Sequence, residues 1–106
     1  MMQGNENDQA RAPAVKKLMS TTLGEFHRNL ERLVPGLAIE AGQRRFEIPH
    51  SGGQITITVR PAETAVLGGL VKLERQDVTL AFANLTPGKA DGFVAAFDRV
   101  FQRGGG

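Results

Sequence analysis

The tetrapeptide His50-Ser51-Gly52-Gly53 is the stretch whose residue types could most directly perform chemistry. A histidine beside a serine could serve as a base and a nucleophile, and the glycines could present backbone N–H groups to an anion. Esterases that use a His-Gly-Gly loop also need a G-x-S-x-G nucleophile elbow, which this sequence lacks. Neighbouring residues on a turn usually point apart, and no third group is placed to orient the histidine. We therefore interpret the tetrapeptide as a turn between strands and predict no catalytic residue.

An anion could instead bind at the start of the second predicted helix, near Lys89. Helix N-termini carry free N–H groups and the positive end of the helix dipole. The sequence lacks the phosphate-binding patterns G-x-x-x-x-G-K-[ST] and G-x-G-x-x-G. Lys89, His50 and Ser51 therefore remain as candidate ligand-binding residues for an alternative function, a small-ligand or anion-binding domain.

Metal binding has little support in the sequence. The chain has no cysteine, which excludes disulfides and thiolate zinc sites. It has two histidines, His27 and His50, and neither has an acidic residue at metal-ligand spacing. We interpret His27 as a residue at the boundary of a helix's apolar stripe, and we predict no metal and no cofactor.

The charge balance and the aromatic residues disfavour a nucleic-acid partner. The net charge is only +2 although the pI is about 9.5, and the only adjacent basic pairs are Lys16-Lys17 and Arg44-Arg45. All six aromatic residues are phenylalanines at predicted core positions, so none is available to stack on bases. No apolar run approaches the roughly 18 residues of a membrane helix. The sequence also lacks the apolar core of a signal peptide, so we expect a cytoplasmic protein without a membrane partner.

Two amphipathic helices are indicated by their capping residues. Thr22 and Glu25 fit a capping box at the start of the first helix, in which each side chain satisfies a free backbone N–H. Thr86 is the expected N-cap of the second helix, with Pro87 as its first residue. Gly104 is the expected end of that helix.

Alternating apolar residues predict several half-buried strands between the helices. The alternation covers residues 37–41, 46–48, 55–59 and 78–82. The sequence therefore predicts a two-layer α+β domain, in which an antiparallel meander of four to five strands carries the N-terminal and C-terminal helices on one face.

The composition changes at both ends of the chain. Residues 1–19 are mostly polar, and we predict a disordered N-terminal tail there. Residues 20–103 form the single predicted α+β domain, and 104–106 form a flexible glycine tail.

The segment 61–76 contains many apolar residues that follow no single period, interrupted by Gly68-Gly69. Its second half could pair as a strand with residues 77–83 or, as an edge strand, with a second copy. Residues 66–71 could fold back as a lid over the core, or they could form an exposed partner site. The candidate partner-binding residues are Val66, Leu67, Leu70 and Val71.

These residues lead us to expect a non-enzymatic interaction module that self-associates or binds a protein partner through the apolar segment 64–73. The sequence does not indicate the pathway or the identity of the partner.

Overall fold

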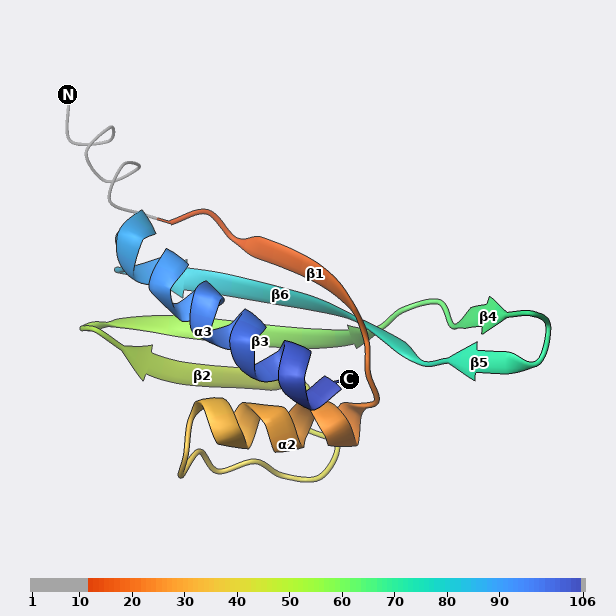
Figure 1. The fold of residues 1–106 in the computed structure, drawn as a ribbon. Coiled ribbons are helices and arrows are strands. Elements are labelled where there is room, and N and C mark those ends of the chain that lie inside the picture. The colour runs from red at the N-terminus through yellow and green to blue at the C-terminus, as the bar shows by residue number, and fades with distance from the viewer. Residues whose placement is uncertain (1–11, 106) are drawn as a thin grey trace.

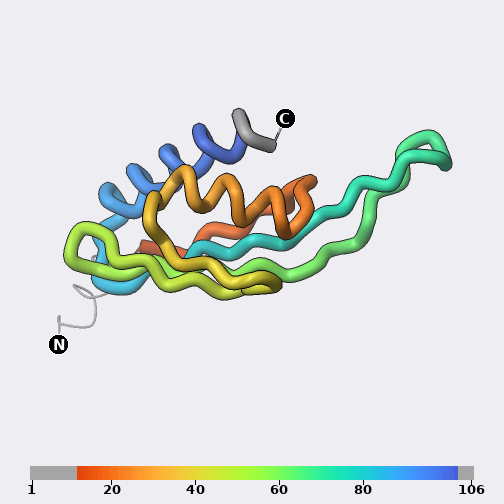
Figure 2. Tube along the Cα trace, turned by 90° about the horizontal axis from the view of Figure 1, so that it is seen from below, coloured from red at the N-terminus to blue at the C-terminus, as the bar shows by residue number. Residues whose placement is uncertain are grey.

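The computed structural model describes residues 12–105 and shows an α+β domain of two layers (Figure 1). The elements in chain order are β1 (Val15–Ser20), α2 (Leu23–Leu33), β2 (Arg45–His50), β3 (Gly53–Pro61), β4 (Ala65–Leu67), β5 (Val71–Leu73), β6 (Arg75–Ala83) and α3 (Pro87–Gly105). Four strands form an antiparallel sheet in the order β1-β6-β3-β2, and β4 pairs only with β5. Both helices cover the same face of the four-stranded sheet (Figure 2). The predicted fold class is confirmed.

The core lies between the sheet and the two helices, and phenylalanines fill its centre. Phe26 of α2 lies with its ring centroid 6.1 Å from Phe46 of β2, and 6.3 Å and 4.9 Å from Phe97 and Phe101 of α3. All six phenylalanines are buried, as the sequence predicted. Aromatic rings in these tilted arrangements bury large apolar areas and hold the helices on the sheet.

The turn between β2 and β3 is the two-residue connection that the glycines predicted. Ser51 and Gly52 have φ angles of 49° and 83°, and His50 pairs with Gly53 across the turn. Positive φ at both central residues gives the turn a twist that matches the twist of the two strands. The stretch that resembled a catalytic motif is therefore a hairpin turn.

Both helix starts have the predicted caps. The Glu25 N–H donates to the Thr22 hydroxyl over 3.1 Å, and the Thr22 N–H donates to the Glu25 carboxylate over 3.0 Å. The Lys89 N–H donates to the Thr86 hydroxyl over 3.4 Å. At its other end α3 extends to Gly105, one residue beyond the predicted helix end at Gly104. The flexible glycine tail over 104–106 stays a prediction. Gly106 lies outside the described residues.

The prediction of disorder over residues 1–19 is wrong from residue 12 onward. Ala12 is buried, and Val15–Ser20 form β1, an edge strand that pairs along its whole length with β6. The charged pair Lys16-Lys17 concealed this strand in the sequence. The Lys17 ammonium lies 2.8 Å from the Asp98 carboxylate of α3, so this lysine takes a place on the helix-covered face. Residues 1–11, the rest of the predicted tail, lie outside the described residues.

The predicted strand over 37–41 is also wrong. This segment is a loop, and a tight turn at its end is closed by the Gln43 N–H donating to the Glu40 carbonyl over 3.1 Å. Leu37 and Ile39 pack against the core from the loop. Their alternation reflects a chain that follows the core surface without a neighbouring strand.

The segment between β3 and β6 projects from the end of the sheet as an arm (residues 62–74), visible at the right of Figure 2. Its strands β4 and β5 pair with each other, so residues 71–73 do not pair with 77–83 as one of our alternatives supposed. None of the arm's residues belongs to the buried core, which rules out the lid. The molecule measures 57 × 30 × 22 Å, elongated for a chain of this length.

Candidate functional site: an apolar arm and two unequal sheet edges

The arm is a short hairpin closed by a glycine turn. The Leu70 N–H donates to the Leu67 carbonyl over 3.2 Å, and the intervening Gly68 and Gly69 have φ angles of 60° and 75°. Residues with a side chain rarely adopt this conformation, so both glycines are needed for the reversal. The turn places the Leu70 side chain at the tip, where it is 90% exposed.

Strand register separates the arm's side chains into two faces. Ala65 pairs with Leu73, and Leu67 pairs with Val71, so these four side chains share one face, which we call the apolar arm face. Leu67 and Val71 are each 54% exposed. Val66 pairs with Lys72 on the opposite face. Three of the four predicted partner-binding residues, Leu67, Leu70 and Val71, therefore lie on the apolar arm face or at its tip, and Val66 lies on the other face.

A buried glutamine holds the base of the arm. The Gln76 side chain is 1% exposed and accepts a hydrogen bond from the Arg44 guanidinium over 3.1 Å. Its amide donates to the Thr21 carbonyl over 3.3 Å and to the Glu74 carboxylate over 3.0 Å. Gln76 therefore links β6, the start of α2 and the loop before β2. We did not predict this cluster, although a glutamine in phase with the apolar residues of β6 is a signal that could have found it.

Two further hydrogen bonds extend the β3–β6 pairing into the arm. The Ala62 N–H donates to the Arg75 carbonyl over 2.9 Å, and the Arg75 guanidinium donates to the Glu63 carbonyl over 2.9 Å. The arm therefore leaves the sheet as a continuation of two paired strands, which fixes its direction at the base.

The candidate ligand residues are placed without a shared contact. The His50 ring is half-buried and lies edge-on to Phe93, with ring centroids 5.4 Å apart. Ser51 is exposed on the turn, and Lys89 is exposed in the first turn of α3. Among the described residues, no hydrogen bond or ion pair joins any two of these three side chains.

His27 lies at the boundary of the core, where it contacts a loop carbonyl and a core ring. Its Nε2 lies 2.8 Å from the Gln43 carbonyl, and its ring lies edge-on to Phe46 at 5.7 Å. Over residues 12–105, no group of three or more His, Cys, Asp or Glu residues is arranged to hold a metal ion. In the same part of the chain, no helix is both long enough and apolar enough to cross a membrane.

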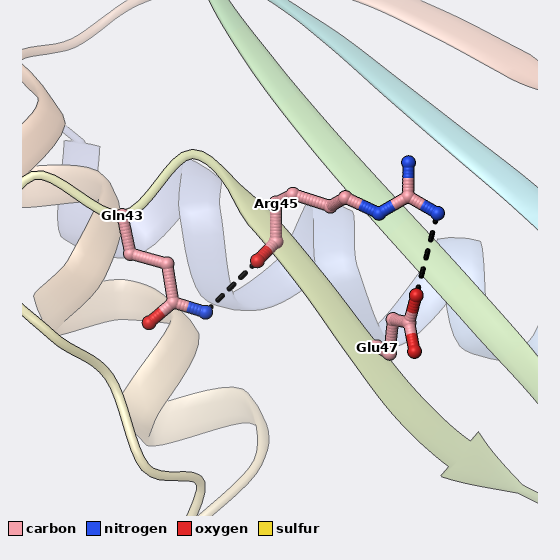
Figure 3. Close-up of polar contacts among 3 residues, drawn as sticks. All are labelled: Gln43, Arg45 and Glu47. Atoms are coloured by element: carbon pink, nitrogen blue, oxygen red, sulfur yellow. Dashed lines mark hydrogen bonds and ion pairs between the residues drawn. The ribbon is translucent and has the colours of Figure 1, made fainter.

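The two outer edges of the sheet differ in the backbone groups that they leave free. At the β2 edge the Gln43 side chain donates to the Arg45 carbonyl over 2.8 Å. The Arg45 guanidinium donates to the Glu47 carboxylate over 3.3 Å (Figure 3). Pro49 on the same strand has no N–H. These features obstruct the addition of another strand to β2.

A hollow of about 540 Å³ lies beside the opposite edge strand, β1. Met19 of β1, the buried Asn29 of α2 and the buried Phe101 of α3 line it, together with the Lys17–Asp98 ion pair. We call it the β1 hollow. The sequence could not reveal it, because β1 itself was not predicted.

Comparison with protein-family models gives no match, and searches of curated proteins and of solved structures return no significant match to this chain. Function is therefore inferred from the arm and the sheet edges.

Proposed function

We propose that the protein is a non-enzymatic interaction module whose arm binds a protein partner. The observation that supports this function is the apolar arm face, which no other described element covers. An isolated two-stranded hairpin is only marginally stable in water. Exposed apolar surface that is concentrated on one element is typical of a binding site.

The shape of the arm indicates the kind of partner surface. The arm is two strands wide and carries Leu70 at its tip, so it fits an apolar groove that receives a projecting element. Burial of Leu67, Leu70 and Val71 would supply most of the binding free energy, since a few central apolar anchors dominate such interfaces. Lys72 on the other face would stay at the polar rim.

Three substitutions on the two faces of the arm test this function. We expect Leu67→Asp and Val71→Asp to weaken partner binding at least about 30-fold, which corresponds to the roughly 2 kcal/mol lost at an interface hot spot. Val66→Asp introduces the same charge on the opposite face and serves as the matched control, which should retain binding. The measurement is affinity capture from cells of the source organism, followed by titration of the captured protein.

The thermal midpoint of all three variants should match that of the unaltered chain, because no arm residue belongs to the core. Equal capture by the Leu67→Asp and Val66→Asp variants would contradict the proposed role of the apolar arm face.

A further inference from the structure

The hydrogen-bond pattern of the sheet shows which backbone groups of β1 face outward. The Thr21 N–H donates to the Glu74 carbonyl over 3.0 Å, one residue pair beyond the end of β1. Antiparallel strands exchange hydrogen bonds at every second pair. Lys17 and Met19 are therefore hydrogen-bonded to β6, whereas Lys16, Leu18 and Ser20 direct their N–H and C=O groups to the free edge.

The Ala62–Arg75 hydrogen bond gives the same result independently. It places Asp77 among the β6 residues that bond to β3, so Gln76, Val78 and Leu80 bond to β1. These are the partners of Met19, Lys17 and Val15 in the observed register. The β1 edge therefore offers a row of backbone donors and acceptors that no described residue occupies, in contrast to the obstructed β2 edge.

We propose that two copies of the chain pair β1 with β1 in antiparallel orientation about a two-fold axis at Leu18, which joins the two sheets into one. In this register Leu18 faces the partner's Leu18, and Lys16 faces the partner's Ser20. Lys17 faces the partner's Met19. An axis at Lys16 or at Lys17 would set two lysines directly against each other, which is unfavourable.

Both faces of the joined strands gain contacts in this register. On the open face of the sheet, Leu18 is 55% exposed, and the partner's Leu18 would cover it. On the helix-covered face, the partner's Met19 would lie next to Lys17, at the β1 hollow. The hollow has a mixed polar and apolar lining, and a flexible thioether side chain can adapt to such an irregular space and contact Met19 and Phe101 there.

This interface is separate from the arm and does not depend on the proposed function. The arm leaves the sheet beside the Ser20 end of β1, since Ser20 pairs with Arg75. The two-fold axis would therefore place the two arms at opposite ends of the joined sheet, where each remains free for its own partner.

Engineered cysteines test the register directly, because the chain has no cysteine of its own. Hydrogen-bonded antiparallel pairs have Cα atoms about 5.5 Å apart, within the range that a disulfide spans. We expect Leu18→Cys to form a disulfide-linked dimer on mild oxidation, seen as a doubled mass without reductant. Ala81→Cys, exposed on the same face of the inner strand β6, is the matched control and should stay monomeric.

A mixed pair adds a second check of the register. Lys16→Cys mixed with Ser20→Cys should give the heterodimer, and neither variant should cross-link with itself. Self-linkage of Lys16→Cys, or absence of linkage for Leu18→Cys, would overturn the register.

Light scattering tests the association itself. We expect the unaltered chain at high concentration to show twice its mass of 11.4 kDa, and Leu18→Pro to show the single-chain mass while remaining folded. Proline at position 18 removes an N–H that faces outward and breaks no hydrogen bond to β6. Lys17→Pro removes an N–H bonded to β6, so this matched control should lower the thermal midpoint.

The arm variant Val71→Asp should leave the dimer mass unchanged. The proposal would be overturned by any of three results: the unaltered chain stays monomeric, the Leu18→Pro variant stays dimeric, or Val71→Asp dissociates the dimer. Dissociation by Val71→Asp would instead assign self-association to the arm.

Discussion

Gly53 shows how one missing side chain allows two segments to approach closely. A Cβ atom at this position would lie on the Ala83 carbonyl oxygen, 2.6 Å from the Asn84 carbonyl oxygen and 2.8 Å from Leu85 Cγ. Two of these neighbours are backbone atoms that cannot rotate away. Asn84 itself has a φ of 59°, so the chain turns sharply where β6 ends beside Gly53.

We expect Gly53→Ala to lower the free energy of unfolding by about 1–3 kcal/mol, the usual cost of forcing extra volume into a packed site. Gly52→Asn is the matched control, because an added Cβ at Gly52 meets nothing within 4 Å and asparagine tolerates a positive φ. Urea unfolding of both variants is the measurement. A smaller loss for Gly53→Ala than for Gly52→Asn would show that the close approach is not a constraint.

Individual residues were predictable where one local pattern decides their structure. The glycine turn after His50 follows from residue type and from the strand alternation on either side of it. The exposure of Leu67 and Leu70 was only one of two alternatives, because the segment around them follows no single period. The phase of Gln76 in β6 could have indicated its burial, but its partners Thr21 and Arg44 could not be predicted, because they come from distant parts of the chain. Hydrogen bonds between separate segments leave no periodic signal in a sequence.

At the scale of elements, α2 begins with a reciprocal cap that depends on a charged carboxylate. The hydrogen bond from the Thr22 N–H holds the pKa of Glu25 below its ordinary value. A lowered folded pKa stabilises the fold fully above the unfolded pKa of about 4.3, and this stabilisation is lost as the pH falls through the folded pKa. Because Glu25 is partly exposed, this pH-dependent stabilisation should be below about 1 kcal/mol.

We therefore expect the unaltered chain to lose more stability between pH 6 and pH 3 than the Glu25→Gln variant, which can accept the same hydrogen bond without a charge. Thermal midpoints across this pH range are the measurement. Parallel midpoint curves for the two proteins would exclude a contribution from Glu25 ionisation.

Whole elements were predictable in proportion to how regularly they face the core. Both helices and the strands β2, β3 and β6 carry apolar residues at the period of their structure, so the sequence revealed them. The edge strand β1 has one neighbour and carries Lys16 and Lys17, which weakens its apolar alternation. Residues 37–41 alternate but find no neighbouring strand, since pairing depends on topology and not on the local pattern.

At the scale of the whole molecule, the arm makes the protein longer than its core requires. The radius of gyration is 15.5 Å. A compact chain of this length would have about 13 Å. The buried core includes residues of the four-stranded sheet and both helices but none of the arm. The residues that form the core and the residues that form the projecting surface are therefore in different parts of the chain.

Replacement of residues 64–73 by Asn-Gly should leave the fold intact, because the hydrogen-bonded pair of Ala62 and Arg75 can close the remaining four-residue loop Glu63-Asn-Gly-Glu74, a common hairpin length. We expect the free energy of unfolding to change by less than about 1 kcal/mol, since most surface changes outside a core have small effects. Urea unfolding and affinity capture are the two measurements. A shortened chain that no longer folds would show that the arm stabilises the domain, and one that still captures the partner would place the binding site elsewhere.

The glycine turn at Gly68-Gly69 also bears on how this chain can diversify. Exposed loop tips are where insertions are best tolerated, and this tip lies at the far end of the arm, away from the core. Changes in the length or sequence of the tip would therefore leave folding unaffected while altering the surface that the arm presents. Natural selection, or a peptide library inserted at the tip, could vary the exposed surface of the arm and the stability of the domain independently of each other.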